Sequence, residues 1–410
     1  MSLIRYQKGK SFWMESSEST AYPKLASDIE TDVAIIGAGI AGLTSAYLLK
    51  QAGLKVVVLE QNVVGGGTTG HTTGKVTSQH GLVYSKLYGH LGKEAAQAYG
   101  EANQAAVEEV RKIIEEEKMD CDWRAEDNYV YTEKDGQVAS LKWEAEVAAS
   151  LGLPATFETE TPLPFGVRGA VRFRDQGTFH ARKYVLGLAR AVHGNGSYIF
   201  EHTKAGHVSD GNPATVRTEG GTVRAKHVIL ASLVPYPVSA HTAYGLVEYP
   251  LVSYIVAVRS EHDLPGMYIS TGGSTYSILP VRTKEDKLLL VGGQSHIPGT
   301  GFAKSKYEKL LRFAKERLNA TPTEYRWQAW DYLGYDDVPA IGRLYPWSKN
   351  FYVATGFMKW GMTNGTVSGM ILRDLITGKG NPWAATFDST RGSTVASIPR
   401  FLTKLPRMVG

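Results

Sequence analysis

The sequence contains only one cysteine, Cys121, among its 410 residues. A single thiol excludes an intrachain disulfide, a zinc site built from thiolates and an iron–sulfur cluster ligated by cysteines of this chain. We therefore predict no metal site, and we expect any redox chemistry to depend on an organic cofactor.

Long hydrophobic runs and blocks of charge are also missing. The apolar stretches have the length of strands and are interrupted by glycine or charged residues, so we predict no transmembrane segment. The N-terminus has no apolar core of the kind found in signal peptides, which makes the cytoplasm the expected location. The net charge of +5 is spread along the chain, and this argues against nucleic acid as a partner.

The strongest motif that is present lies near the start of the chain. Residues 32–43 read Asp-Val-Ala-Ile-Ile-Gly-Ala-Gly-Ile-Ala-Gly-Leu, which predicts an apolar strand, a Gly-x-Gly-x-x-Gly turn and the start of a helix. Gly37 allows the tight turn, Gly39 lets the backbone approach a pyrophosphate, and Gly42 lets the helix pack closely on the strand. The helix N-terminus adds unpaired N–H groups and a positive dipole end, so the phosphates need no lysine.

An acidic residue stands at a matching distance from this turn. Glu60 closes the apolar run 56–59 and lies 60 − 42 = 18 residues after Gly42, close to the roughly 20 expected of a carboxylate that holds a ribose 2′-hydroxyl. The simpler alternative is a glycine-rich turn in an ordinary strand–helix–strand unit. Because the flanking strand, the helix and the second strand all fit, we favour a bound adenine dinucleotide.

The remainder of the chain predicts two interleaved domains. Helical periodicity over 84–117 is followed by strand-like runs joined by turn-rich segments, as in an antiparallel sheet: 128–132, 169–173, 251–258, 276–280 and 287–291. Runs typical of buried parallel strands return at 223–231 and 350–355. We expect a discontinuous dinucleotide domain (30–85, 175–240 and 336–380) and an inserted substrate domain (86–174 and 241–335). The tail, 386–410, could be an amphipathic docking segment or a loosely held end, and we assign it no function.

Two further segments favour a flavin over a nicotinamide cofactor. Small polar residues fill 65–74, directly after Glu60, where they could line an extended cofactor. A second glycine turn, 356–365, follows a strand and leads into a helix predicted over 367–376, whose N-terminus would face a ligand. No second Gly-x-Gly-x-x-Gly opens a second dinucleotide domain, so we predict a single FAD rather than FAD together with NAD(P)H.

Taken in order, these segments resemble the D-amino-acid oxidase, glycine oxidase and sarcosine oxidase superfamily of FAD-dependent oxidoreductases over about residues 30–385. The resemblance also uses the segment 175–192 and the string Asp-Asp-Val-Pro-Ala-Ile-Gly at 336–342. Within the superfamily, 11–15, 69–75 and 359–365 are similar to the flavoprotein part of bacterial proteins that carry a C-terminal Rieske iron–sulfur domain. This chain ends where that domain would begin, so we expect electrons to leave by another route.

The resemblance implies a fold and a chemistry. The fold is a mixed α/β architecture, in which a Rossmann-like FAD-binding domain is interleaved with an antiparallel-sheet substrate domain. The chemistry is oxidation of the C–H bond beside an amine nitrogen, by hydride transfer to flavin N5 with an imine as the product. The expected substrate is a small amine or amino acid, and oxygen or a separate electron-carrier protein would accept the electrons.

The family's motifs also imply contacts with the cofactor. Lys359 is the candidate catalytic residue, because positive charge near flavin N1 and the C2 carbonyl stabilises the reduced ring; a solvent-facing turn lysine is the alternative. The loop 67–71 ends in His71 and is similar to the loop through which dimethylglycine and sarcosine dehydrogenases attach FAD covalently; non-covalent relatives use this loop for simple contacts, and we favour such a contact for His71. Expected FAD contacts are Gly37, Gly39, Ile40, Ala41, Gly42, Glu60, Gln61, Gly67, Thr68, Thr69, His71, Thr72, Thr73, Ala205, Ala231, Gly356, Phe357, Lys359, Trp360, Gly361, Met362 and Thr363.

One substitution bears on the substrate. Glycine-oxidase-like members place an arginine eight residues before the proline of the Asp-x-x-Pro-x-Ile-Gly motif, where it binds a substrate carboxylate. Counting back from Pro339 gives 339 − 8 = 331, which is Asp331, a residue that would instead attract an ammonium group. This favours an amine, a polyamine-like compound or a secondary amine over a simple amino acid, unless the alignment is shifted in this loop.

Aromatic and histidine side chains complete the candidates. The aromatic rings could line the substrate pocket or belong to the core: Tyr254, Tyr276, Trp327 and Trp330. His80 and His180 could act as bases, but oxidation of a neutral amine needs none. Two other functions remain open, namely an NAD-dependent dehydrogenase, which leaves the glycine-rich segments after Glu60 unexplained, and a flavin-binding electron-transfer subunit that needs a partner.

Overall fold

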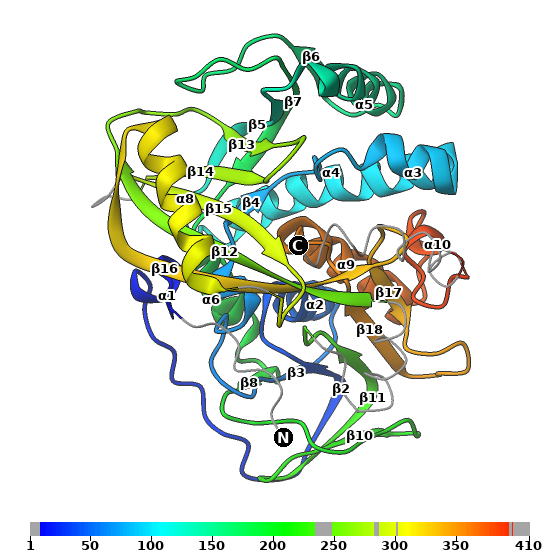
Figure 1. Cartoon of the computed structure of the whole chain (residues 1–410). Coiled ribbons are helices and arrows are strands. Elements are labelled where there is room, and N and C mark those ends of the chain that lie inside the picture. Colours follow the sequence, from blue (N-terminus) through cyan, green and yellow to red (C-terminus); the bar gives the residue numbers. More distant parts are fainter. Residues whose placement is uncertain (1–8, 234–247, 283–286, 301, 393–395, 397–410) are drawn as a thin grey trace.

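The computed structural model describes residues 9–233, 248–282, 287–300, 302–392 and 396 (Figure 1). Two large sheets organise these residues, and helices pack between them and over their outer faces. This is the mixed α/β architecture that the sequence predicts. None of the helices in the described ranges combines the length and the apolar character that a membrane span requires.

The first sheet has eight strands and contains the fingerprint strand, β2. Its order is β17, β18, β11, β2, β3 and β8, with β10 beside β11 and β9 beside β10. The pairings β11–β18, β11–β2, β2–β3 and β3–β8 are parallel, as expected for apolar runs that are buried on both faces. The strands are β2 (Ile29–Ile36), β3 (Val56–Leu59), β8 (Tyr198–Phe200), β9 (Val208–Ser209), β10 (Ala214–Arg217), β11 (Thr222–Leu230), β17 (Ala340–Arg343) and β18 (Phe351–Thr355).

The second sheet has ten strands and is mostly antiparallel. Its order is β1, β16, β12, β15, β14, β13, β5, β7 and β4, with β6 beside β7; only β13 and β5 pair in parallel. The strands are β1 (Gly9–Lys10), β4 (Lys75–Val76), β5 (Arg124–Thr132), β6 (Ala155–Glu158), β7 (Gly169–Thr178), β12 (Glu248–Ser260), β13 (Met267–Ser270), β14 (Tyr276–Arg282), β15 (Lys287–His296) and β16 (Ala320–Gly334).

The two faces of this second sheet have different neighbours. On one face, alternate residues of β12 such as Val256 and Val258 pack against the helix α8 (Ala303–Leu318), which crosses the sheet in Figure 1. On the other face, Ile255, Ala257 and Trp327 pack against the short helix α1 (Phe12–Glu15). Strand alternation therefore assigns each side chain of these strands to the α8 face or to the α1 face.

The other helices cover the two sheets. The predicted helix over 84–117 is divided at Gly92, whose φ of 87° ends one helix before the next begins. The second of the pair, α4, is amphipathic and buries residues at helical spacing, including Tyr99, Ala106 and Val110. The remaining helices are α2 (Ile40–Gln51), η1 (Thr68–His71), α3 (Tyr84–Leu91), α4 (Lys93–Glu116), η2 (Asp135–Gln137), α5 (Val138–Ser150), α6 (Ala181–Val192), α9 (Gly361–Ile376) and α10 (Ala384–Phe387).

Helices α2 and α9 lie against each other in the interior (Figure 1). A Cβ atom on Gly365 would lie 2.9 Å from the Ile40 side chain, and one on Gly369 would lie 3.0 Å from the Thr44 side chain. The absence of side chains at these two positions therefore permits the close approach. It brings together the N-terminal ends of two helices that are more than three hundred residues apart in sequence.

The predicted domain boundaries stay a prediction. Most of the tail, including 397–410, lies outside the described residues, so its amphipathic pattern also stays a prediction. Residues 386–392 and 396 of the tail are described; among them Phe387 is fully buried at the end of α10, and Arg391 forms buried polar contacts.

Candidate functional site

The fingerprint turn has the shape required to hold a dinucleotide. Gly37 follows β2 with a φ of 110°, and a Cβ atom there would lie 2.8 Å from the carbonyl oxygen of Ala231. A Cβ atom on Gly42 would lie 1.9 Å from the carbonyl oxygen of Gly37, so only glycine fits. Helix α2 begins after Gly39, which has no side chain to cap it, and the first N–H of the helix, that of Ile40, donates to the side chain of Thr69. The glycine turn therefore places the positive end of the helix dipole beside backbone that a ligand can approach, which fits a pyrophosphate.

Glu60 lies beside this turn at the end of β3. Its Oε2 accepts a hydrogen bond from the N–H of Ala38 (3.0 Å), and its Oε1 accepts one from the N–H of Asn62 (2.8 Å). Burial raises the pKa of the carboxyl group, which the two N–H donors oppose. Each oxygen keeps a lone pair for a ribose hydroxyl, so the side chain fits the predicted role. Of the other predicted contacts, Ala231 follows the end of β11 beside the turn, Ala205 is buried in the same core cluster as β10, and Gln61 is exposed.

The loop 65–74 crosses from the first sheet to the second. Thr69 Oγ1 accepts a hydrogen bond from the N–H of Ile40 at the start of α2 (3.0 Å), and Thr68 Oγ1 donates to the carbonyl of Trp330 (3.0 Å). Trp13 of α1 donates its indole N–H to the carbonyl of Thr72 (2.7 Å). These bonds fix the loop to the helix end, to β16 and to α1.

His71 is buried in this loop. Its Nδ1 lies 3.0 Å from the carbonyl oxygen of Gly67, and its own carbonyl accepts the indole N–H of Trp327 (2.8 Å). Burial lowers the pKa of the imidazole to about 4, so the ring is neutral at physiological pH. A neutral imidazole held by its Nδ1 leaves Nε2 as the atom available to a cofactor.

The second glycine turn follows β18. Gly356, Met358 and Lys359 have φ values of 71°, 58° and 70°, so the backbone turns sharply before α9 starts at Gly361. The helix thus begins six residues before the predicted 367, because the turn is completed earlier. Trp360 stacks on the imidazole of His80, with 4.8 Å between ring centroids. The predicted contacts Phe357, Gly361, Met362 and Thr363 belong to this turn and to the first turn of α9.

Lys359 and Asp331 meet where this turn reaches the second sheet. The N–H of Lys359 donates to Asp331 Oδ2 (2.7 Å), and its Nζ donates to the hydroxyl of Ser295 (2.5 Å), which contacts the hydroxyl of Ser253 (2.9 Å). The lysine side chain is open to water although protein surrounds it closely, so it lines a recess rather than the outer surface.

Both members of this pair have shifted pKa values. Loss of hydration lowers the pKa of Lys359 to about 8, against the opposing effect of Asp331. Loss of hydration also raises the pKa of Asp331 to about 6, which the N–H donors of Tyr332 and Lys359 oppose. At neutral pH the Lys359 side chain is therefore mostly protonated and the Asp331 carboxyl group mostly ionised.

Neither candidate histidine has the geometry of a free base. His80 is buried between the hydroxyl of Tyr99 at Nδ1 (2.6 Å) and the carbonyl of Thr77 at Nε2 (2.8 Å), and burial lowers its pKa to about 3. His180 Nδ1 accepts the N–H of Lys183 as the N-cap of α6, and burial lowers its pKa to about 3 as well. Both rings are neutral and hold backbone in place.

The aromatic candidates lie on different faces of the second sheet. Trp327 is on the α1 face, where it contacts the loop that contains His71. Tyr254 and Tyr276 pack on the α8 face, with Tyr276 stacked on Phe313 at 4.0 Å between centroids, and Trp330 packs with them. The structure therefore brings Trp327 and Asp331 to the side of Lys359, and it does not bring Tyr254 or Tyr276 there.

Sequence reasoning missed Ser253, Ser295 and Glu248. The two serines occupy facing strands, and only their register makes them a pair beside Lys359. Glu248 is a buried carboxyl group at the start of β12, next to Gly356. The sequence offered one sign of this residue, namely a carboxylate just before the apolar residues of a predicted strand. Among the described residues, no cluster of His, Cys, Asp or Glu suits a metal ion.

Comparison with known proteins places this geometry in context. The model of the FAD dependent oxidoreductase family (DAO) matches residues 32–375. The putative Rieske 2Fe-2S iron-sulfur protein YhfW of Bacillus subtilis is 34% identical over 385 residues, which cover 93% of this chain and 75% of that protein. Gamma-glutamylputrescine oxidoreductase of Escherichia coli is 25% identical over 410 residues, covering 95% and 92%. The crystal structure of glycine oxidase from Geobacillus kaustophilus superposes with a TM-score of 0.72 at 21% identity, covering 88% and 99%.

Proposed function

The chain belongs to the DAO family of FAD-dependent oxidoreductases, and we propose that it oxidises the C–H bond beside the nitrogen of an amine. Family membership supplies the premise that the protein binds FAD and acts on amines or amino acids. The chemistry that FAD supplies is hydride acceptance at N5, which leaves the substrate as an imine that water hydrolyses. The residues of the chain would bind the substrate and stabilise the charge that develops on the flavin.

The observation that carries the proposal is the position of Lys359. It precedes α9, whose N-terminal end adds a positive dipole, and its ammonium group is held by Ser295 on the second sheet. A fixed positive charge at this junction would stabilise the negative charge that develops on a reduced flavin. We propose Lys359 as the residue that provides this stabilisation.

Asp331 supports an amine as the substrate. Its carboxylate is mostly ionised at neutral pH and lies on the α1 face of the sheet, beside the recess that Lys359 lines. Both oxygens already accept one backbone N–H, and each keeps a lone pair for a substrate ammonium group. We propose polyamine-like or secondary amines as the substrate class; Trp327, which is fully buried against α1, supports the loop of His71 rather than lining the site.

The first experiment records the absorption spectrum of the purified protein before and after acid precipitation. Flavin colour that stays in the pellet would indicate covalent attachment through His71, and colour in the supernatant would indicate contact only. The second experiment compares steady-state oxidation of putrescine and of glycine. Turnover of putrescine in clear excess supports the amine proposal, and comparable rates on glycine would contradict it.

The role of Lys359 has its own test with a matched control. Lys359→Met should slow flavin reduction by about 100-fold, the usual effect of removing one group that stabilises a developing anion. Lys349→Met changes an exposed lysine before β18 and should leave the rate unchanged. Equal rates in the two variants would remove Lys359 from the mechanism.

A second candidate function concerns the electron acceptor. The relative that is 34% identical is named as a Rieske iron–sulfur protein, whereas this chain has one cysteine and cannot ligate such a cluster alone. We propose an electron carrier as the acceptor, with oxygen as the alternative. Slow reoxidation in air that is rescued by an artificial one-electron acceptor supports a carrier, and rapid reoxidation by oxygen would favour an oxidase.

A further inference from the structure

Glu248 is a buried carboxyl group that the proposed chemistry does not use. It is the first residue of β12, and its side chain is 4% exposed. Oε2 accepts a hydrogen bond from the hydroxyl of Thr355 at the end of β18 (3.2 Å). Oε1 has no hydrogen-bond partner among the residues that the structure describes. A buried oxygen without a partner is costly in a folded protein, so it requires an explanation.

The partnerless oxygen lies directly against the second glycine turn. A Cβ atom built on Gly356 would lie 2.6 Å from Oε1, so the carboxyl group occupies the space beside the Gly356 Cα atom. Gly356 has a φ of 71° and starts the sharp turn that ends at Lys359. The carboxyl group and the turn therefore fit together only because residue 356 has no side chain.

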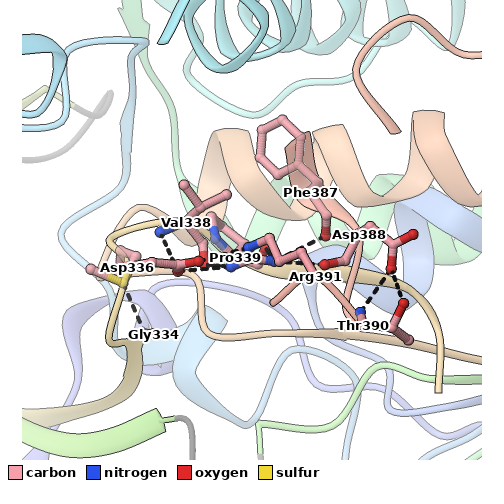
Figure 2. A network of polar contacts seen from close by, with 9 residues as sticks. Gly334, Asp336, Val338, Pro339, Phe387, Asp388, Thr390 and Arg391 are labelled. Carbon is pink, nitrogen blue, oxygen red and sulfur yellow. Dashed lines mark hydrogen bonds and ion pairs between the residues drawn. The ribbon is translucent and has the colours of Figure 1, made fainter. Parts of the chain in front are cut away.

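The charged neighbours of Glu248 are of mixed sign. Asp331 and Asp336 oppose its ionisation, and Arg391 favours it. Figure 2 shows that Arg391 is already engaged, since its Nε and Nη2 donate to Asp336 at 2.8 and 2.9 Å. It also donates to the carbonyls of Val338, Pro339, Phe387 and Asp388.

The balance of these effects keeps Glu248 neutral at physiological pH. Burial is the main cause, and it raises the pKa of the carboxyl group to about 8, although the hydrogen bond from Thr355 opposes this shift. The titratable groups near it are the charged groups already named and two phenols near the end of β16, Tyr332 and Tyr335; Tyr249, the next residue in the chain, stacks on Tyr335. An ionised Glu248 would place a negative charge under the turn.

We propose that Glu248 is a positioning residue of the cofactor turn, which supports Gly356 and sets the electrostatic potential that the turn presents to the flavin ring. This inference rests on the proposed function in one respect: it takes the turn 356–359 to lie against the flavin ring. A neutral carboxyl group leaves the positive potential of Lys359 and of the α9 N-terminus intact. Ionisation opposes that potential, and so the reduced, electron-rich form of FAD becomes less stable.

The test measures sulfite affinity as a function of pH. Sulfite adds to oxidised flavin and leaves negative charge on the ring, so its Kd, followed by loss of the visible flavin band, reports the local potential without an amine substrate. From about pH 7 to about pH 9 we expect the ratio of the wild-type Kd to the Glu248→Gln Kd to rise on the order of tenfold. This is the effect of one charge acting over about 10 Å at an effective dielectric constant of about 20. Sulfite and Lys359 titrate alike in the wild type and in Glu248→Gln, so their effects cancel in the ratio of the two Kd values. A ratio that stays constant from about pH 7 to about pH 9 would overturn the proposal.

A second variant guards against poor folding of the first. Thr355→Val removes the hydrogen bond that favours the ionised carboxylate, so the transition in sulfite affinity should move to higher pH. A transition that stays at the wild-type pH would also overturn the proposal. A wild-type protein that binds FAD and sulfite but turns over no amine would contradict the proposed function and leave this test valid.

Discussion

Replacing Arg391 by methionine should destabilise the protein by about 3–5 kcal/mol, because the change leaves a buried carboxylate without its cation. The side chain of Arg391 is 10% exposed and that of Asp336 is 1% exposed. The bidentate bond between them joins the segment after α10 to the turn between β16 and β17 (Figure 2). Methionine fills a similar volume but donates no hydrogen bond, so Asp336 loses both guanidinium donors, although it keeps the N–H of Val338, and several backbone carbonyls lose a donor.

Thermal unfolding of the FAD-saturated protein measures this effect. An unfolding entropy of about 2 cal/mol/K per residue gives about 0.9 kcal/mol per degree for a chain of this length, so the melting temperature should fall by about 3–6 °C. Arg190→Met is the matched control, since Arg190 and Glu18 form an exposed ion pair whose removal should cost about 1 °C or less.

A double-mutant cycle separates the ion pair from the loss of packing. Asp336→Asn in the Arg391→Met background removes the negative charge that has lost its guanidinium partner, so the double variant should be more stable than the sum of the two single losses by about 2 kcal/mol. Strictly additive losses, or an Arg391→Met melting temperature equal to that of the control, would refute the argument from a buried charge.

Three further predictions follow from the site. Gly42→Ala should weaken FAD binding by about 1–3 kcal/mol, roughly 5- to 150-fold, because the new methyl group meets the Gly37 carbonyl; flavin fluorescence measures it, and Gly89→Ala, where space is open, should have no effect. The pH profile of kcat/KM should fall below about pH 6 as Asp331 gains a proton and above about pH 8 as Lys359 loses one, and Asp331→Asn should abolish only the acid limb. Tyr276→Ala should lower the melting temperature through loss of its stacking on Phe313 without a change in KM, and a raised KM at unchanged stability would place this ring at the substrate.

Local patterns were the part of the structure that the sequence could predict. The fingerprint turn depends on contacts between neighbours such as Gly37 and Gly42, so its spacing alone indicates its geometry. The helix break at Gly92 was not predicted, because periodicity continues across it and only the backbone angle reveals it. Counting along a motif selected Asp331, which the structure brings to Lys359.

Contacts between strands that are distant in sequence could not be predicted from the sequence. Strand alternation predicts that Tyr254 and Ser253 face opposite sides of a sheet, but it does not say which side faces the site. The pairing of Ser253 with Ser295, and of Glu248 with Gly356, depends on register and on how two sheets meet. The residues around Ser253, Ser295, Glu248 and Gly356 show no local pattern from which these contacts could be predicted.

The contact between α2 and α9 has a consequence for how the protein is made. The fingerprint helix leaves the ribosome long before its packing partners Gly365 and Gly369, which are synthesised more than three hundred residues later. At about 5–20 residues per second this delay lasts on the order of 15–70 seconds. During that interval the nascent chain contains the complete dinucleotide motif without the surface that closes it, so we expect stable uptake of the cofactor to follow the synthesis of α9.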